Sequence, residues 1–97
     1  MPTFVVLANW TDQGIAEFRD SPKRSDAFAS TLKQAGGKVR DIFWTIGAYD
    51  MVAIADAPDD ETMTAVLLQS GALGNVRTTT LRAFSKREFN EISKRAG

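Results

Sequence analysis

The chain has 97 residues, with hydrophobic residues at 43% and charged residues at 25%, a composition typical of one globular domain spanning residues 1–97. Twelve basic and twelve acidic side chains cancel, so the net charge favours neither nucleic acid nor an anionic membrane as a partner. The sequence has no Cys and no His, which excludes a disulfide, a thiolate nucleophile and His-ligated metal. We therefore expect no cofactor and no metal, and only Asp, Glu, Lys and the single Tyr remain for proton transfer.

The N-terminus leads directly into an apolar strand at residues 3–10. No basic segment precedes this run, and it is too short for a signal peptide or a membrane span, so we expect a cytoplasmic protein. Thr11 is placed to cap a short helix that buries Ile15 and Phe18 on one face.

A longer helix is predicted to begin at Ser21 as the cap, with Pro22 in its first turn. Its apolar positions follow the i, i+3, i+4, i+7 spacing of an amphipathic helix: Phe28, Ala29, Leu32 and Ala35. The pair of glycines at 36–37 ends the helix.

Two apolar runs, residues 39–46 and 51–57, flank a tip at residues 47–50 and predict an antiparallel hairpin. We expect Gly47 to adopt a positive φ there. Pro58 ends the second of these strands, and Asp59 or Asp60 caps a helix whose apolar residues are Met63, Val66 and Leu67. We interpret the acidic residues at this helix start as caps rather than metal ligands.

The last strand is predicted at residues 75–84. Ser85 and Glu88 then form a capping box, with Phe84 and Phe89 at the two positions of a hydrophobic staple. The order β-α-α-β-β-α-β-α predicts an α+β fold of the ferredoxin-like β-α-β-β-α-β kind, with a split first helix and an added C-terminal helix.

The strands do not alternate between apolar and polar residues, as a sheet with one face in water would. Residues 4–7, 42–44 and 51–54 place large apolar groups on both faces. The simplest cover for the second face is the same face of another copy, which predicts a homodimer and is compatible with a higher oligomer. In the alternative, the additional apolar groups pack the rim of the sheet and the ends of the long helices.

Several segments resemble the GYD domain family, small bacterial proteins related to the dimeric α/β-barrel superfamily. The resemblance runs nearly end to end and is carried by Asn9-Trp10-Thr11 with Gly14, Arg24, Gly36-Gly37, residues 43–50, residues 57–59 and residues 74–84. Two positions depart from the family pattern: Asp56 stands where Glu is expected, and Phe43 stands where Tyr is common. The resemblance implies the ferredoxin-like fold with sheets paired as a dimeric α/β barrel.

Tyr49 and Asp50 at the hairpin tip are the candidate catalytic pair. In the functional interpretation, this phenol and carboxylate line the mouth of a pocket. In the structural alternative, Asp50 accepts hydrogen bonds from backbone N–H groups and Tyr49 covers the edge of the sheet.

The candidate ligand-binding residues extend beyond the tip. Trp10 and Trp44 are interpreted first as packing groups and alternatively as walls for an aromatic ligand. Thr80 shares a strand face with Arg82, and a buried guanidinium at a central position of the sheet needs an anionic partner, from Asp50, from Asp56 or from a ligand. The full predicted set is Asn9, Trp10, Trp44, Tyr49, Asp50, Thr80 and Arg82.

Two functions compete. The first is a small homo-oligomeric module that binds a small apolar or aromatic molecule in the cleft between sheet and helices. The second is a cofactor-free enzyme, oxygenase-like or isomerase-like, that acts on an aromatic or polyketide-like substrate with Tyr49 or Asp50 as acid or base. In that case Asn9 and Arg82 orient a substrate oxygen. The absence of His favours the binding module.

Overall fold

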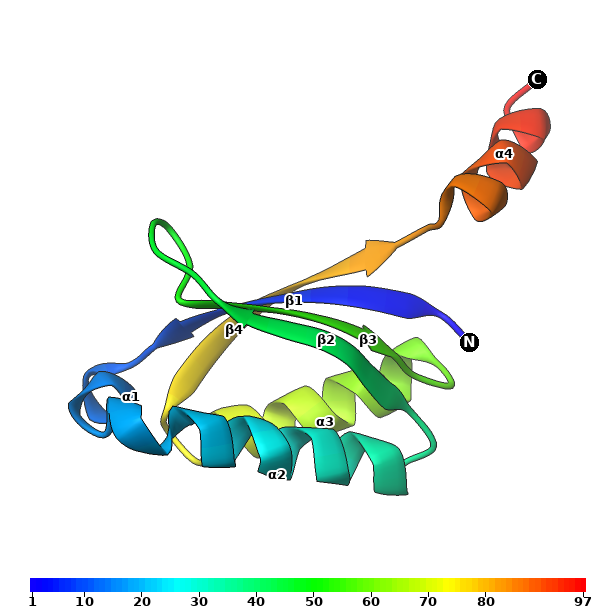
Figure 1. The fold of residues 1–97 in the computed structure, drawn as a ribbon. Coiled ribbons are helices and arrows are strands. Elements are labelled where there is room, and N and C mark those ends of the chain that lie inside the picture. Colours follow the sequence, from blue (N-terminus) through cyan, green and yellow to red (C-terminus); the bar gives the residue numbers. More distant parts are fainter.

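The computed structural model describes residues 1–97, and its four strands form one antiparallel sheet with the order β2-β3-β1-β4. The strands are β1 (Thr3–Trp10), β2 (Lys38–Trp44), β3 (Met51–Asp56) and β4 (Val76–Ala83). The helices are α1 (Asp12–Ala16), the 3₁₀ turn η1 (Phe18–Asp20), α2 (Ser21–Gln34), α3 (Asp60–Ala72) and α4 (Lys86–Arg95). The predicted ferredoxin-like α+β fold is confirmed, with its divided first helix and added last helix (Figure 1).

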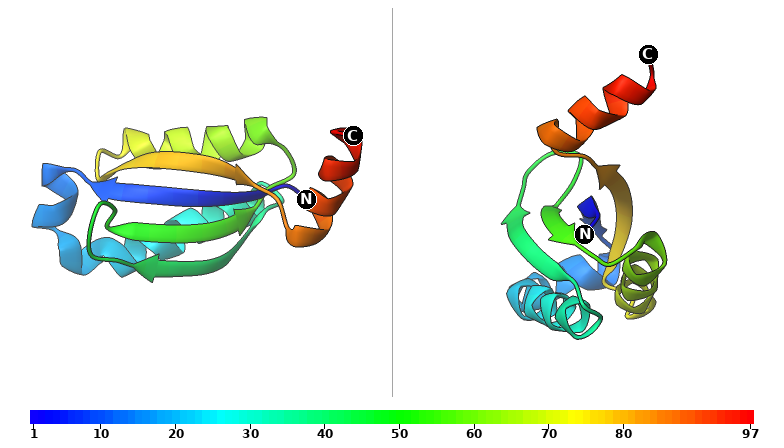
Figure 2. Two further views of the ribbon diagram at one scale, coloured as in Figure 1. Left: turned by 90° about the horizontal axis from the view of Figure 1, so that it is seen from above. Right: turned by 90° about the vertical axis from the view of Figure 1, so that its right-hand side faces the viewer.

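Helices α2 and α3 cover one face of the sheet, and the main core lies between these two layers (Figures 1 and 2). Phe4 and Ala55 contribute to it from the sheet, Leu32 from α2, and Met63 and Val66 from α3. Only 12 of the 97 residues are buried, so the chain by itself excludes little apolar surface from water.

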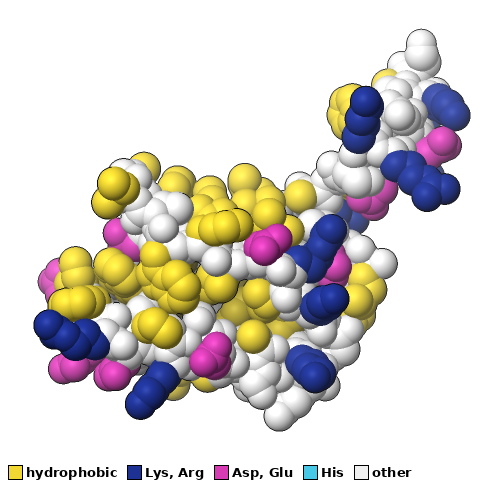
Figure 3. Space-filling model, in the orientation of Figure 1, with side chains coloured by type: hydrophobic (Ala, Val, Ile, Leu, Met, Phe, Trp, Pro, Cys, Tyr) yellow, Lys and Arg dark blue, Asp and Glu magenta, His cyan; other side chains and the backbone are white.

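The other face of the sheet, which we call the open face, is apolar and has no helix over it (Figure 2, left). The pairing register places on it a continuous set of apolar side chains: Val5, Leu7, Phe43, Val52, Ile54 and Leu81. Hydrophobic side chains gather along this face between the hairpin tip and α4 (Figure 3). The prediction of strands that are apolar on both faces is therefore confirmed.

The hairpin tip rises on the open-face side and is tied to β1 by hydrogen bonds (Figure 1). The Asp50 N–H donates to the Ala8 carbonyl at 2.9 Å, and the Asp50 side-chain Oδ2 accepts from the Trp10 N–H at 2.9 Å. Gly47 has φ +124°, as predicted, in a conformation that side chains oppose. The bonds of Asp50 extend the pairing of β1 and β3 beyond the first residue of β3.

The segment between β1 and α2 differs from the prediction. Thr11 caps α1 as expected, accepting from the Gly14 N–H at 3.1 Å. However, Ile15 and Phe18 are 52% and 48% exposed, because α1 and η1 lie beyond the end of the sheet and have no layer to bury them (Figure 1). Ser21 is not a cap: it is buried within α2, where its hydroxyl accepts from the Trp44 indole N–H at 2.9 Å.

Helix α4 extends away from the sheet on the open-face side, at the end opposite the hairpin tip (Figures 1 and 2). It begins with the predicted capping box, in which Ser85 and Glu88 satisfy each other's backbone N–H groups. Hydrogen bonds from the Ser85 backbone and then from its hydroxyl lower the pKa of Glu88. Phe84 and Phe89, at the staple positions, remain about half exposed. None of the helices has the length and apolar character needed to cross a membrane.

The tie between the tip and β1 makes Asp50 testable as a structural residue. Asp50→Ala leaves the half-buried Trp10 N–H without an acceptor, so we expect the free energy of unfolding to fall by about 1–3 kcal/mol. Asp50→Asn keeps an acceptor oxygen, so we expect a smaller fall in the free energy of unfolding. Urea unfolding followed by tryptophan fluorescence measures both.

Tyr49→Phe is the matched control, because Tyr49 accepts a hydrogen bond from the Thr45 hydroxyl through its backbone carbonyl, which the substitution keeps. This variant keeps the stability of the parent. If Asp50→Ala also unfolds like the parent, Asp50 does not hold the tip.

Candidate functional site

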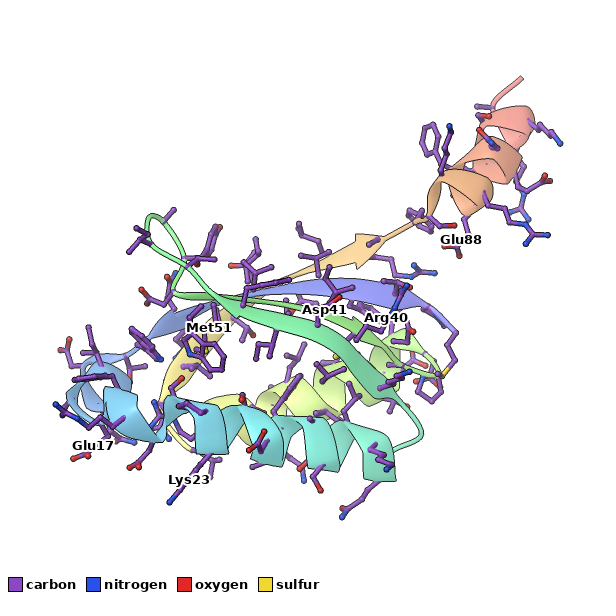
Figure 4. The ribbon with its side chains drawn as sticks, in the orientation of Figure 1. Glu17, Lys23, Arg40, Asp41, Met51 and Glu88 are labelled. Atoms are coloured by element: carbon purple, nitrogen blue, oxygen red, sulfur yellow. The ribbon has the colours of Figure 1, made fainter.

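A cavity of about 610 Å³ lies between the sheet and helices α2 and α3. Phe28 and Leu67 line this cavity and also pack against the core. Val6 and Ala8 of β1 and Met51 and Ala53 of β3 form its floor. Met51 points from the sheet toward the helices (Figure 4).

Small residues on the sheet leave this space. Ala8 and Ala53 lie on the helix-facing side, where they are paired with Met51 and Val6 on the neighbouring strands. An alanine at such a position supplies one methyl group where a larger residue would reach the helices. The cavity volume is within the range of about 300–1,000 Å³ that is usual for small-molecule sites.

The helices supply the remaining walls. From α2, Arg24, Phe28 and Thr31 lie at i, i+4 and i+7 and therefore share one face of the helix. From α3, Leu67 and Ser70 line the cavity at i and i+3. Of the 19 lining residues 11 are hydrophobic, so the site suits a mainly apolar molecule.

Arg24 is the one charged residue of the lining. Its guanidinium donates to the Glu17 carbonyl at 3.0 Å and to the Gly14 carbonyl at 3.1 Å. Asn75 lines the same cavity, and its carbonyl accepts from the Thr11 N–H at 3.1 Å. The lining therefore combines an apolar interior with hydrogen-bond donors.

None of the predicted ligand-binding residues lines this cavity. Three of them lie at or beside the tip: Trp10, Tyr49 and Asp50. The Asp50 carboxylate accepts a hydrogen bond from the Trp10 backbone N–H. Trp44 is 43% exposed and bound to Ser21, and Asn9 is exposed on the open-face side of β1. A binding role for these residues stays a prediction.

Thr80 and Arg82 lie on β4, facing the helix side opposite Val6 and Phe4. Arg82 pairs with neither Asp50 nor Asp56, two of the three anionic partners predicted for it, because β4 is an edge strand on which Arg82 is exposed. The guanidinium stacks instead on Phe84, 4.5 Å from the ring centre. Arg82 is paired with Phe4 of β1, and Asp50 is bonded to Ala8 of the same strand. Four residues of strand, about 13 Å, therefore separate Arg82 from Asp50. Asp56 pairs with Arg40 at 3.5 Å.

The sequence contains one weak indication of the cavity, which lies in the pattern of α2. The face of α2 that contacts the sheet alternates Phe28 and Leu32 with the polar Arg24 and Thr31, where a closed core would be uniformly apolar. The alanines of the sheet give no signal by themselves, because alanine is equally common in filled cores.

Comparison with known proteins identifies a family and several similar proteins. A model of the GYD domain matches residues 4–93 of the chain. A Thermus thermophilus protein named glutamine synthetase and cystathionine beta-lyase binding protein is 33% identical over 84 residues, which is 86% of this chain and 88% of that protein.

Two solved structures are similar. A protein from Thermus thermophilus superposes with a TM-score of 0.56 at 28% identity, covering 88% of this chain and 95% of its own. MtbAldR superposes with a TM-score of 0.63 at 16% identity, over 88% of this chain but 52% of its own, and this likeness concerns the fold alone. With the family model matching from β1 into α4, the chain belongs to the GYD domain family.

Proposed function

We propose that this protein is a homodimeric binding protein that holds a small, mainly apolar molecule between its sheet and helices. The observation that carries the proposal is the 610 Å³ cavity, whose floor comes from the sheet and whose walls come from α2 and α3. Filling this space with an apolar molecule would add the buried contacts that a chain with few buried residues lacks. A cytoplasmic location stays a prediction.

The composition of the lining supports binding over catalysis. Its residues include no Asp, Glu, Lys or Tyr, the groups that could transfer a proton in a chain without His. Tyr49 and Asp50 lie outside the cavity, and the Asp50 carboxylate has a backbone partner. The enzyme alternative would therefore need a second site at the tip.

The dimer forms in this proposal by packing the open face against the same face of a second copy. Phe43, Val52 and Leu7 lie side by side across β2, β3 and β1, so the apolar strip crosses three strands. The tip and α4 rise at the two ends of this strip and bound the space for the second sheet (Figures 1 and 3). A two-fold contact of this kind buries about 1,600 Å² in total.

A second candidate function is binding to another protein. The Thermus relative is named for binding two enzymes, and this chain exposes apolar side chains outside both the cavity and the open face. Phe89 of α4 is 59% exposed on a helix that extends from the body. We propose that α4 presents these side chains to an enzyme of the classes named for the relative.

The cavity is tested by filling it. Ala53→Phe places a ring on the cavity floor, and we expect it to abolish the methyl NMR shifts that neutral apolar probes cause at Met51 and Leu67 in the parent. The probes are naphthalene-2-carboxamide, decanamide and indole. Ala65→Phe, on the exposed side of α3, is the matched control and leaves those shifts unchanged. A parent whose cavity methyls respond to no probe contradicts the proposal.

The dimer is tested by charge on the open face. The parent should sediment at twice the chain mass of 10.6 kDa or more. Phe43→Lys places an ammonium group in the proposed interface and should raise the dimer dissociation constant by about 100-fold or more, since an unpaired buried charge costs several kcal/mol. Leu68→Lys, on the exposed side of α3, should keep the parent's mass. A Phe43→Lys protein that remains dimeric would place the interface elsewhere.

Protein binding is tested with purified glutamine synthetase and cystathionine β-lyase from the same organism as this chain. We expect one of them to bind in a calorimetric titration. Phe89→Ser with Phe84→Ser should weaken that binding by about ten-fold or more, since exposed aromatic anchors dominate such contacts. Phe18→Ser, at the other end of the molecule, serves as the control. Equal binding by all three proteins excludes α4 as the contact.

A further inference from the structure

We propose that the molecule held in the cavity is an amphipathic organic acid, and that Arg24 receives its carboxylate. The inference rests on the proposed function, because it specifies the chemistry of the ligand of that cavity. The chemical class is an apolar body, aliphatic or aromatic, with one anionic end.

The charge of the cavity points to this class. Arg24 is its one charged lining residue, and the other polar residues are hydroxyl and amide side chains. Lys23 precedes Arg24 on α2 but points away from the molecule (Figure 4). The lining of the cavity therefore carries a single positive charge.

Backbone carbonyls hold the guanidinium in place. Arg24 donates one bond to the carbonyl of Gly14, within α1, and one to the carbonyl of Glu17, the residue that follows α1. Gly14 in turn lies so close to the backbone of Asn75 that an added Cβ would overlap the Asn75 carbonyl oxygen. This contact fixes α1 against the start of β4, and Arg24 is fixed through α1. A guanidinium positioned in advance loses little freedom when it binds an anion.

The charge of Arg24 has no partner within the chain. A guanidinium has five N–H donors, and the bonds to Glu17 and Gly14 leave three of them available. The two ion pairs of the structure are Arg40 with Asp56 and Lys94 with Glu91. Glu17 contacts Arg24 through its backbone carbonyl, and its side chain points outward (Figure 4). A half-buried cation beside an apolar cavity is stabilised by an anion that enters that cavity.

The apolar walls exclude more polar anions. Phe28, Leu67 and Met51 would contact the body of the ligand, and hydroxyl groups there would lose water without gaining enough partners. A sugar phosphate or a nucleotide fits these walls poorly for this reason. In the structural alternative, Arg24 only joins α1 to α2 and does not distinguish an acid from its neutral analogue.

Matched pairs of probes distinguish these interpretations. Naphthalene-2-carboxylate is compared with naphthalene-2-carboxamide, and decanoate with decanamide, by calorimetry at neutral pH. Each pair has nearly the same shape and differs in charge. We expect the acid of at least one pair to bind about ten-fold more tightly or better than its amide, as for one charge-assisted hydrogen bond. Both members should shift the methyl signals of Met51 and Leu67.

Substitutions then assign the preference to one side chain. Arg24→Gln should remove the acid's advantage and leave the affinity for the amide unchanged, and Arg24→Lys should retain part of the advantage. Arg19→Gln removes the same charge from a residue that stacks on Phe18 and does not line the cavity, so it should bind like the parent.

The outcomes separate this inference from the proposed function. If acid and amide bind the parent equally at the cavity methyls, the cavity binds ligands but Arg24 does not receive an anion, and the inference is overturned. If neither shifts those methyls, the proposed function itself fails. If Arg24→Gln does not fold, the acid-to-amide ratio of the parent and a crystal structure with the bound acid decide. A carboxylate beyond hydrogen-bonding distance of Arg24 in that structure overturns the inference.

Discussion

A sheet that is apolar on both faces needs cover on both faces, and the two long helices of this chain lie on one of them. This constraint organises the molecule. On the helix side, Phe4 and Ala55 reach the closed core, while Ala8 and Ala53 leave a cavity further along the same strands. On the other side, the apolar strip around Val52 meets water in the isolated chain, and its burial by a second copy would lower the free energy through the hydrophobic effect. The proposed ligand would bury apolar surface on the helix face of the sheet, and the proposed second copy would bury it on the open face.

The local signals of the sequence locate the elements well because each depends on residues close in the chain. Thr11 and Ser85 cap the helices that the sequence predicts them to cap, Asp59 is the cap of the two candidates predicted for α3, and Gly47 has the positive φ that its turn requires. The alternation of burial along β1 and β3 follows from the period of two that any strand has, although the residues of these strands are apolar at successive positions.

Features that depend on where elements meet in space are less predictable. The exposure of Ile15 and Phe18 follows from the position of α1 beyond the end of the sheet, which hydrophobic spacing does not encode. The sequence pattern predicts Arg82 in the middle of the sheet, but the strand order places β4 at the edge. The cavity depends on which alanines face the helices and on how α2 and α3 lie over them, and neither is a property of one segment. The candidate site therefore lies in the layer below the tip and not at the tip itself.

The tip has a structural role that links the two faces. The Asp50 carboxylate accepts a hydrogen bond from the Trp10 N–H, and the Asp50 N–H donates one to the Ala8 carbonyl. Ala8 is part of the cavity floor. The tip rises on the side where the second copy is proposed to bind, and Ile46, the residue before it, is fully exposed. Contacts that order the tip would also hold β1 and β3 in register beneath the cavity, because the bonds of Asp50 continue that register. The proposed assembly on the open face and the proposed binding on the helix face would thus act on one pair of strands, which Asp50 of the tip holds together through hydrogen bonds to backbone groups of β1.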